Sequence, residues 1–176
     1  MDNRIALKPG EILCFPGMEC EIEKFVGKGS NAIVYRGRYK DALQNGLFHH
    51  VLIKELFPFS EEKSIYRNSD NSIVVTEKGE ELFALQRLSF ENGNKIHLSM
   101  LEKHPDKIGS NINTFNLNNT LYTVLGFDAG KSMDKYYLEK EKNLRYVASL
   151  MKDILNVVNA FHQAGYLHLD ISPDNI

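Results

Sequence analysis

The sequence predicts an α+β fold: a five-stranded antiparallel sheet with one helix, followed by a linking segment and a second long helix. Short runs rich in Val, Ile, Tyr and Phe follow one another, bounded by Gly, Asn or Asp, which is typical of antiparallel strands. A long segment with helical spacing interrupts them, and a strongly periodic helix follows them. We therefore expect an extension at 1–18, a sheet-bearing part at 19–125 and a helical part at 126–176.

Three strands come first, at 19–29, 32–39 and 49–57, and their close spacing predicts a meander. Residues 64–77 predict a small hairpin, because two short apolar runs flank a polar turn at 70–71.

The segment 78–104 predicts a helix that is bent or interrupted near Gly93, because its apolar residues recur close to the helical period. Strands at 111–118 and 120–127 predict a further hairpin, which turns at 118–119. The apolar residues of the helix are Leu82, Leu85, Leu88, Ile96 and Met100.

A second helix is expected from Asn143 onward, where apolar residues recur at i, i+3, i+4 and i+7. Gly165 is placed to end it, since glycine readily adopts the backbone conformation of a helix C-terminus. The apolar set is Leu144, Val147, Ala148, Met151, Ile154, Leu155, Val158 and Phe161.

The composition describes a globular chain of 176 residues with a net charge of −2 and 43% hydrophobic residues. No basic excess supports nucleic-acid binding. No apolar run is long enough to span a membrane, and no signal peptide is evident, so we expect a cytoplasmic location. Cys14 and Cys20 have neither metal-site nor disulfide-framework spacing.

Three groups of residues could carry chemistry. Gly27 and Gly29 end one strand and Val34 enters the next; such a turn lets a phosphate approach backbone N–H groups, although a hairpin turn without a ligand explains it equally well. Lys54 ends an apolar run and, taken alone, could lie on the surface. In the last segment, Asp170 and Asn175 suit a carboxylate that accepts a hydroxyl proton and an amide that holds a divalent cation, or simply a polar turn.

Taken in this order, the three groups resemble the protein kinase family, and the resemblance covers about residues 19–176. FVGKGSNAIVY is similar to the glycine-rich loop, VLIK to the strand that bears the phosphate-binding lysine, and YLHLDISPDNI to the catalytic loop. The segment KELFP after the lysine is similar to bacterial serine/threonine kinases. The resemblance implies the fold described above, with the sheet as the amino-terminal lobe of a kinase and the second helix as the start of the carboxy-terminal lobe.

The resemblance implies that Gly27 and Gly29 cover the phosphates and that Val34 packs on adenine. Ala32 stands where the family has a third glycine. Lys54 would contact the α- and β-phosphates and be held by a carboxylate of the following helix. Glu91 is our choice for this carboxylate, with Glu81 and Glu102 as rivals.

The segment TLYTVLGFDAGKSM is similar to the hinge of the family. Leu125 would guard the rear pocket, Gly126 and Asp128 would contact adenine through the backbone, and Ser132 could reach the ribose. A P-loop is excluded here, because only three residues separate Gly126 from the next glycine, whereas the P-loop pattern needs four.

In the last motif, Asp170 would orient the attacking hydroxyl, Asn175 would bind magnesium and His168 would pack within the loop. Leu169 replaces the usual arginine, so activation by loop phosphorylation is not expected. Ser172 replaces the usual lysine, which leaves the catalytic rate or the substrate class open.

The expected function is ATP- and Mg²⁺-dependent phosphoryl transfer to Ser or Thr of a protein substrate. No D-F-G or A-P-E motif follows Asn175, so we expect the fragment alone to transfer phosphate poorly. A pseudokinase or regulatory binding module and a small-molecule kinase of the same fold are the alternatives. The apolar face of the second helix makes self-association possible.

Overall fold

The chain divides into two compact units, residues 1–127 and 128–176, which are described separately. The computed structural model describes side chains and backbone for residues 2–41, 46–127, 133, 143–169 and 171–173.

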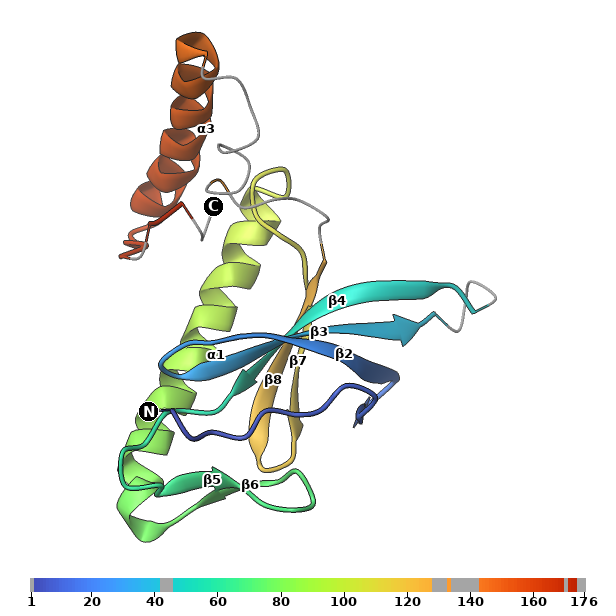
Figure 1. Cartoon of the computed structure of the whole chain (residues 1–176). Coiled ribbons are helices and arrows are strands. Elements are labelled where there is room, and N and C mark those ends of the chain that lie inside the picture. Colours follow the sequence, from blue (N-terminus) through green and yellow to red (C-terminus); the bar gives the residue numbers. More distant parts are fainter. Residues whose placement is uncertain (1, 42–45, 128–132, 134–142, 170, 174–176) are drawn as a thin grey trace. The chain divides into compact units, whose positions relative to one another are not determined.

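The first unit contains a six-stranded antiparallel sheet with the order β1-β2-β3-β4-β8-β7 (Figure 1). This confirms the predicted α+β architecture, with one strand more than the expected five. The additional strand is β1, which belongs to the segment expected as an extension and pairs with β2 at the sheet edge. The strands are β1 (Ile12–Phe15), β2 (Met18–Lys28), β3 (Ala32–Lys40), β4 (Phe48–Leu56), β7 (Asn111–Leu117) and β8 (Thr120–Gly126).

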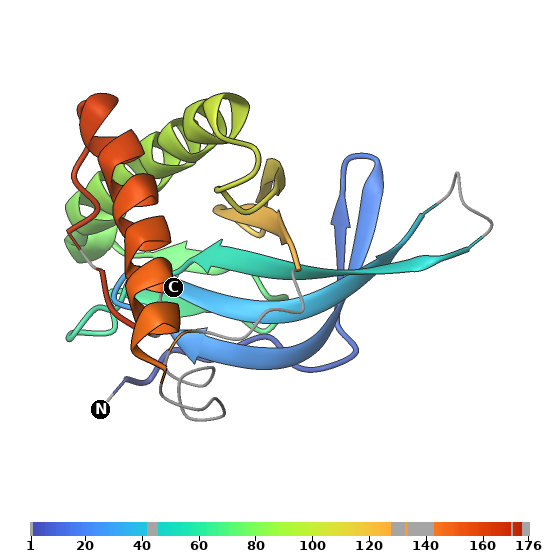
Figure 2. The ribbon, with the colours of Figure 1, turned by 90° about the horizontal axis from the view of Figure 1, so that it is seen from above.

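Side chains alternate between the two faces of this sheet. One face is buried against the N-terminal segment and a separate two-stranded hairpin, β5 (Ile65–Arg67) with β6 (Ile73–Val75). Figure 2, turned by 90° from Figure 1, shows β2, β3 and β4 side by side. The main buried residues of this face are Ile22, Ile33, Tyr35, Val51, Ile53, Tyr122 and Val124.

The same face contains a buried charge network centred on Glu55, which is fully buried. Its carboxylate accepts hydrogen bonds from the hydroxyls of Tyr35 (2.7 Å) and Tyr122 and from the Arg67 guanidinium. Tyr35 also accepts a hydrogen bond from the backbone N–H of Leu7 (3.1 Å). The network therefore joins the N-terminal segment and the small hairpin to the centre of the sheet.

The opposite face is partly covered by α1 (Glu80–Lys103), which a short 3₁₀ turn, η1 (Glu77–Gly79), precedes. Phe90 of α1 packs with Ala32, Leu56 and Leu121 of the sheet. The helix continues through Gly93 without the interruption expected from the sequence. A glycine within a helix costs about 1 kcal/mol relative to alanine, and the buried Phe90 and Met100 on either side offset this cost.

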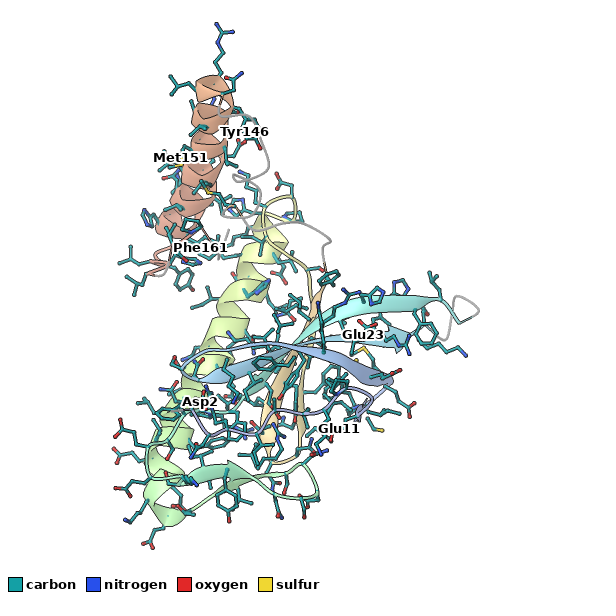
Figure 3. The ribbon with its side chains drawn as sticks, in the orientation of Figure 1. Asp2, Glu11, Glu23, Tyr146, Met151 and Phe161 are labelled. Carbon is teal, nitrogen blue, oxygen red and sulfur yellow. The ribbon has the colours of Figure 1, made fainter. Side chains whose placement is uncertain are left out.

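The second unit contains α3 (Leu144–Gln163), along which Tyr146, Met151 and Phe161 are spaced (Figure 3). The side chain of Asn143 caps its start by accepting the N–H of Arg145 (2.9 Å). Gly165, at φ +84°, ends it as predicted. Within the described ranges, no helix combines the length and the apolar character required to cross a membrane.

Candidate nucleotide site

The turn between β2 and β3 holds its backbone carbonyls in a fixed direction. The N–H of Gly29 donates to the carbonyl of Ala32 (2.9 Å) and closes the turn. The carbonyl of Ser30 accepts from Phe59 N–H (2.9 Å), and that of Asn31 accepts from Phe57 N–H (3.0 Å). These carbonyls are therefore directed toward the segment that follows β4.

The N–H groups of Ser30 and Asn31 have no hydrogen-bond partner in the described part of the chain. In a trans peptide the carbonyl of one residue points opposite to the N–H of the next residue. The Asn31 N–H therefore faces away from Phe59, which holds the Ser30 carbonyl. The Ser30 N–H faces away from Arg4, which donates to the Gly29 carbonyl (2.6 Å). Successive free N–H groups of this kind form a binding site for an anion. The turn is thus able to donate hydrogen bonds to a phosphate.

The glycines of this turn leave space on their outer side. A Cβ atom built on Gly27 would meet nothing within 4 Å, and one built on Gly29 would meet only the Ala32 carbonyl, at 3.9 Å. Neither has a positive φ angle. Packing and backbone strain therefore do not require glycine at these positions, whereas close approach of a ligand would.

Lys54 lies on the sheet face that α1 partly covers. It is paired in register with Val34 of β3 and with Thr123 of β8, so the three side chains project from the same face. Desolvation by burial lowers the pKa of the Lys54 ammonium below its ordinary value. The structure therefore brings together Lys54 and Val34, two residues that the sequence assigns to one site.

The Lys54 ammonium lies over the ring of Phe90, 5.7 Å from its centroid. The carboxylate of Glu91 instead accepts from Arg87 one turn earlier (3.2 Å), and no described carboxylate lies within ion-pairing distance of Lys54. Glu81 and Glu102, the rivals considered for this role, are both exposed. The expected Lys54–Glu91 pair is not formed in this structure.

Thr123 is a polar residue of this face that is not among the residues predicted for the site. It is 1% exposed, and its hydroxyl has no hydrogen-bond partner among the described residues. A threonine in the otherwise apolar run LYTVLG was the available signal. Among the described residues, the Thr123 hydroxyl therefore has no hydrogen-bond partner and the neighbouring Lys54 ammonium has no carboxylate partner.

The end of β8 carries the next predicted residues. Leu125 pairs in register with Leu52. The N–H of Gly126 donates to the Ser110 carbonyl (2.9 Å), and a Cβ at Gly126 would lie 1.9 Å from the Ser110 hydroxyl. Any backbone contact from Gly126 to a ligand must therefore use its carbonyl. Asp128 and Ser132 lie outside the described residues.

The predicted catalytic segment follows α3. His168 packs edge-on against Phe161, with ring centroids 6.2 Å apart, which agrees with a packing role. Leu169 has a positive φ of 61°, a conformation that few non-glycine residues adopt. Asp170 and Asn175 lie outside the described residues, and those that are described contain no cluster of three or more His, Cys, Asp or Glu suited to a metal ion.

Comparison with known proteins identifies the fold. No protein-family model matches the chain. The apo form of PpkA-294 is similar over 97% of this chain and 57% of that chain, with 26% identity and a TM-score of 0.73. The BubR1 kinase domain is similar over 99% of this chain and 45% of that chain, with 21% identity and a TM-score of 0.62. Vaccinia related kinase 3 is similar over 99% of this chain and 48% of that chain, with 17% identity and a TM-score of 0.55.

All three of these proteins are protein kinases, and this chain spans about half of their lengths. The sheet, α1 and the start of the helical part correspond to the first half of that fold. The resemblance stated from the glycine turn, the lysine strand and the last motif is thereby confirmed: the chain has the fold of the amino-terminal lobe of a protein kinase, continued by the first part of the helical lobe.

Proposed function

We propose that this chain binds Mg²⁺-ATP and forms the nucleotide-binding part of a kinase that transfers phosphate to Ser or Thr of a protein substrate. One observation carries the proposal. Among the described residues, the N–H groups of Ser30 and Asn31 have no hydrogen-bond acceptor and the Lys54 ammonium has no carboxylate partner. All three groups can therefore donate to a bound anion. A triphosphate supplies several negative oxygens at once and satisfies all three.

The roles of the individual residues follow from this proposal. The turn at Gly27 and Gly29 would cover the phosphates, and Lys54 would neutralise part of their charge. Val34 would contact the adenine ring from the same sheet face. Glu91 would hold Lys54 only if α1 changed its position, because its carboxylate is now paired with Arg87.

The catalytic residues of the proposal belong to the second unit. Asp170 would accept the proton of the attacking hydroxyl, and Asn175 would hold Mg²⁺ through its amide oxygen. The metal would neutralise charge that develops on the phosphates during transfer. Asp128 and Ser132 would contact the adenosine.

Calorimetric titration of the chain with Mg²⁺-ATP tests the binding step. We expect saturable binding that is weakened at least about tenfold in Lys54→Met, since a charge-assisted contact contributes 1.5 kcal/mol or more. Lys95→Met is the matched control, because Lys95 is exposed on α1. The absence of binding to the wild type, or equal loss in both variants, contradicts the proposal.

Phosphoryl transfer needs its own experiment. Radiolabel from the γ-phosphate of ATP is followed into a generic protein substrate with the full-length protein that contains this chain, and its Asp170→Asn variant is the control. We expect transfer that is abolished in the variant and directed to Ser or Thr; equal signal from both proteins excludes catalysis by Asp170.

A nucleotide-binding module without catalysis is a second candidate, and the position of Phe90 favours it. The Lys54 ammonium lies over the Phe90 ring rather than beside a described carboxylate of α1, and Ala32 and Ser172 depart from the family pattern. Such a module would bind ATP yet give no transfer in the radiolabel experiment.

Self-association through α3 and a cytoplasmic location are further parts of the proposal. Sedimentation velocity tests the self-association.

A further inference from the structure

The N-terminal segment crosses to the turn between β2 and β3 and contacts it through Arg4. Figure 3 shows Asp2 beside this turn, and Figure 1 shows that the N-terminal segment begins next to it. Arg4 is only 6% exposed. Arginine is rarely buried unless it is paired, so this burial indicates that its guanidinium has a specific set of partners.

The Arg4 guanidinium joins three segments. It donates to the carbonyl of Gly29 (2.6 Å) in the turn and to the carbonyl of Phe57 in the segment after β4. It also donates to both carboxylate oxygens of Asp2. A planar guanidinium can serve carbonyls and a carboxylate together, whereas a lysine ammonium lacks this geometry.

In a second contact, β2 donates a hydrogen bond to the N-terminal segment. The Lys28 ammonium, at the end of β2, donates to the backbone carbonyl of Arg4 and lies 3.8 Å from Asp2. The hydrogen bonds from Arg4 lower the pKa of Asp2 to about 2, so its carboxylate remains ionised at neutral pH. The segment and the turn are therefore joined from both sides.

The hydrogen bond to Gly29 determines the orientation of one peptide unit. While the Gly29 carbonyl points toward Arg4, the N–H of Ser30 points the other way, because the two are antiparallel in a trans peptide. Gly29 has no side chain to resist rotation of this unit. Without Arg4 the unit could turn over, which would replace an N–H donor with a carbonyl oxygen that repels phosphate.

We propose that Arg4 is a positioning residue for the nucleotide site, which fixes the Gly29–Ser30 peptide so that the Ser30 N–H faces the phosphates. The inference rests on the proposed function, since it assigns a role toward the nucleotide of that site. Arg4 itself contacts no ligand in this scheme. It acts through the backbone of the turn and makes the N-terminal segment part of the nucleotide-binding unit.

Comparison of ATP with adenosine tests this role, because only ATP has phosphates to meet the turn. We expect Arg4→Ala to bind Mg²⁺-ATP about tenfold more weakly while adenosine affinity stays unchanged. Arg4→Lys should recover part of the loss, since one ammonium can still donate to the Gly29 carbonyl. Lys8→Ala removes the same charge from an exposed residue of the same segment and should bind ATP as the wild type does.

Two outcomes overturn the inference: unchanged ATP affinity in a folded Arg4→Ala protein, or equal weakening of ATP and adenosine. The second would indicate that Arg4 only supports the fold. If Arg4→Ala does not fold, the same comparison is made with Arg4→Lys, for which we expect a smaller loss that is again confined to ATP.

Amide NMR keeps this test separate from the proposed function. If the wild type binds no ATP, the proposed function fails, but the orientation of the turn can still be measured. We expect the amide resonances of Gly29, Ser30 and Asn31 to shift or broaden in Arg4→Ala or Arg4→Lys and to stay unchanged in Lys8→Ala. Unaltered resonances of the turn in the Arg4 variants also overturn the inference.

Discussion

The ammonium of Lys54 lies over the ring of Phe90, 5.7 Å from its centroid, rather than beside a carboxylate of α1. Attraction between a cation and an aromatic face contributes about 0.5–2 kcal/mol. Removing a charged group from water costs several kcal/mol, so this attraction offsets only part of the hydration that the ammonium loses. Lys54 is therefore charged, desolvated and incompletely compensated.

Replacement of Lys54 by methionine should change stability and binding in opposite directions. Methionine fits the apolar surroundings without a desolvated charge, so we expect the free energy of unfolding to rise by about 1 kcal/mol while Mg²⁺-ATP affinity falls. Urea unfolding and calorimetry measure the two quantities. A variant that is both destabilised and unchanged in ATP binding would assign Lys54 a structural role instead.

The lowered pKa of Lys54 predicts an early loss of ATP binding as pH rises. Burial favours the neutral amine. As the pH rises, the ammonium that attracts phosphate therefore loses its proton before pH reaches 10.5, the ordinary pKa of lysine. Lys54→Arg keeps its charge throughout this range, so its affinity should depend less on pH. Titrations at a series of pH values check this, and parallel profiles for both proteins would contradict it.

Stability depends on the same proton with a defined sign. The folded pKa of Lys54 lies below the unfolded one, so the unfolded chain binds more protons between the two values. The free energy of unfolding contributed by Lys54 must therefore rise with pH across this window. The difference in unfolding free energy between the wild type and Lys54→Met should shrink from neutral pH toward pH 10. A constant difference would show that Lys54 has an ordinary pKa.

The charge network on the other face predicts a large loss of stability. Glu55 is fully buried and paired with Arg67, so Arg67→Met leaves a carboxylate with only tyrosine donors and should cost about 3–5 kcal/mol in urea unfolding. Adding Glu55→Gln to that variant removes the uncompensated charge and should restore part of the loss. A double variant less stable than Arg67→Met alone would count against this explanation.

The two cysteines should differ in reactivity. Cys20 is fully buried, and desolvation raises the pKa of its thiol to about 12, whereas Cys14 is exposed. Reaction depends on an accessible thiolate, so a chromogenic disulfide reagent should modify only Cys14 in the native protein and both thiols in denaturant. Rapid native modification of Cys20 in a Cys14→Ser variant would contradict the burial of β2.

Sequence patterns were most informative where local chemistry decides the structure. The turn at Asn118 and Asn119 lies where the hairpin pattern predicted it, and their φ angles of 52° and 59° are a conformation that asparagine tolerates. Helix α3 and its start near Asn143 followed from the apolar periodicity, and in the structure the Asn143 side chain caps this start. The pairing of β2, β3 and β4 followed from short runs rich in Val, Ile, Tyr and Phe that are closely spaced and bounded by turn residues.

What the sequence could not provide depends on contacts between distant segments. β1 has only four residues and pairs at the sheet edge, so its pattern is too short to predict a strand. The rotation of α1 about its axis is also not encoded locally, since Phe90 and Glu91 differ by about 100° and only packing decides which one meets Lys54. The contact between Arg4 and Gly29 joins residues 25 positions apart, and no motif indicated it.

The most direct test of the proposed nucleotide site is an amide NMR titration of the ¹⁵N-labelled chain with Mg²⁺-ATP. We predict that the largest shifts fall on the amides of Ser30 and Asn31, which have no acceptor among the described residues, with accompanying shifts at Lys54. Adenosine at saturation should leave Ser30 and Asn31 unchanged. Shifts confined to other parts of the chain, or none at saturating ATP, would contradict the central claim that this turn and Lys54 bind the phosphates.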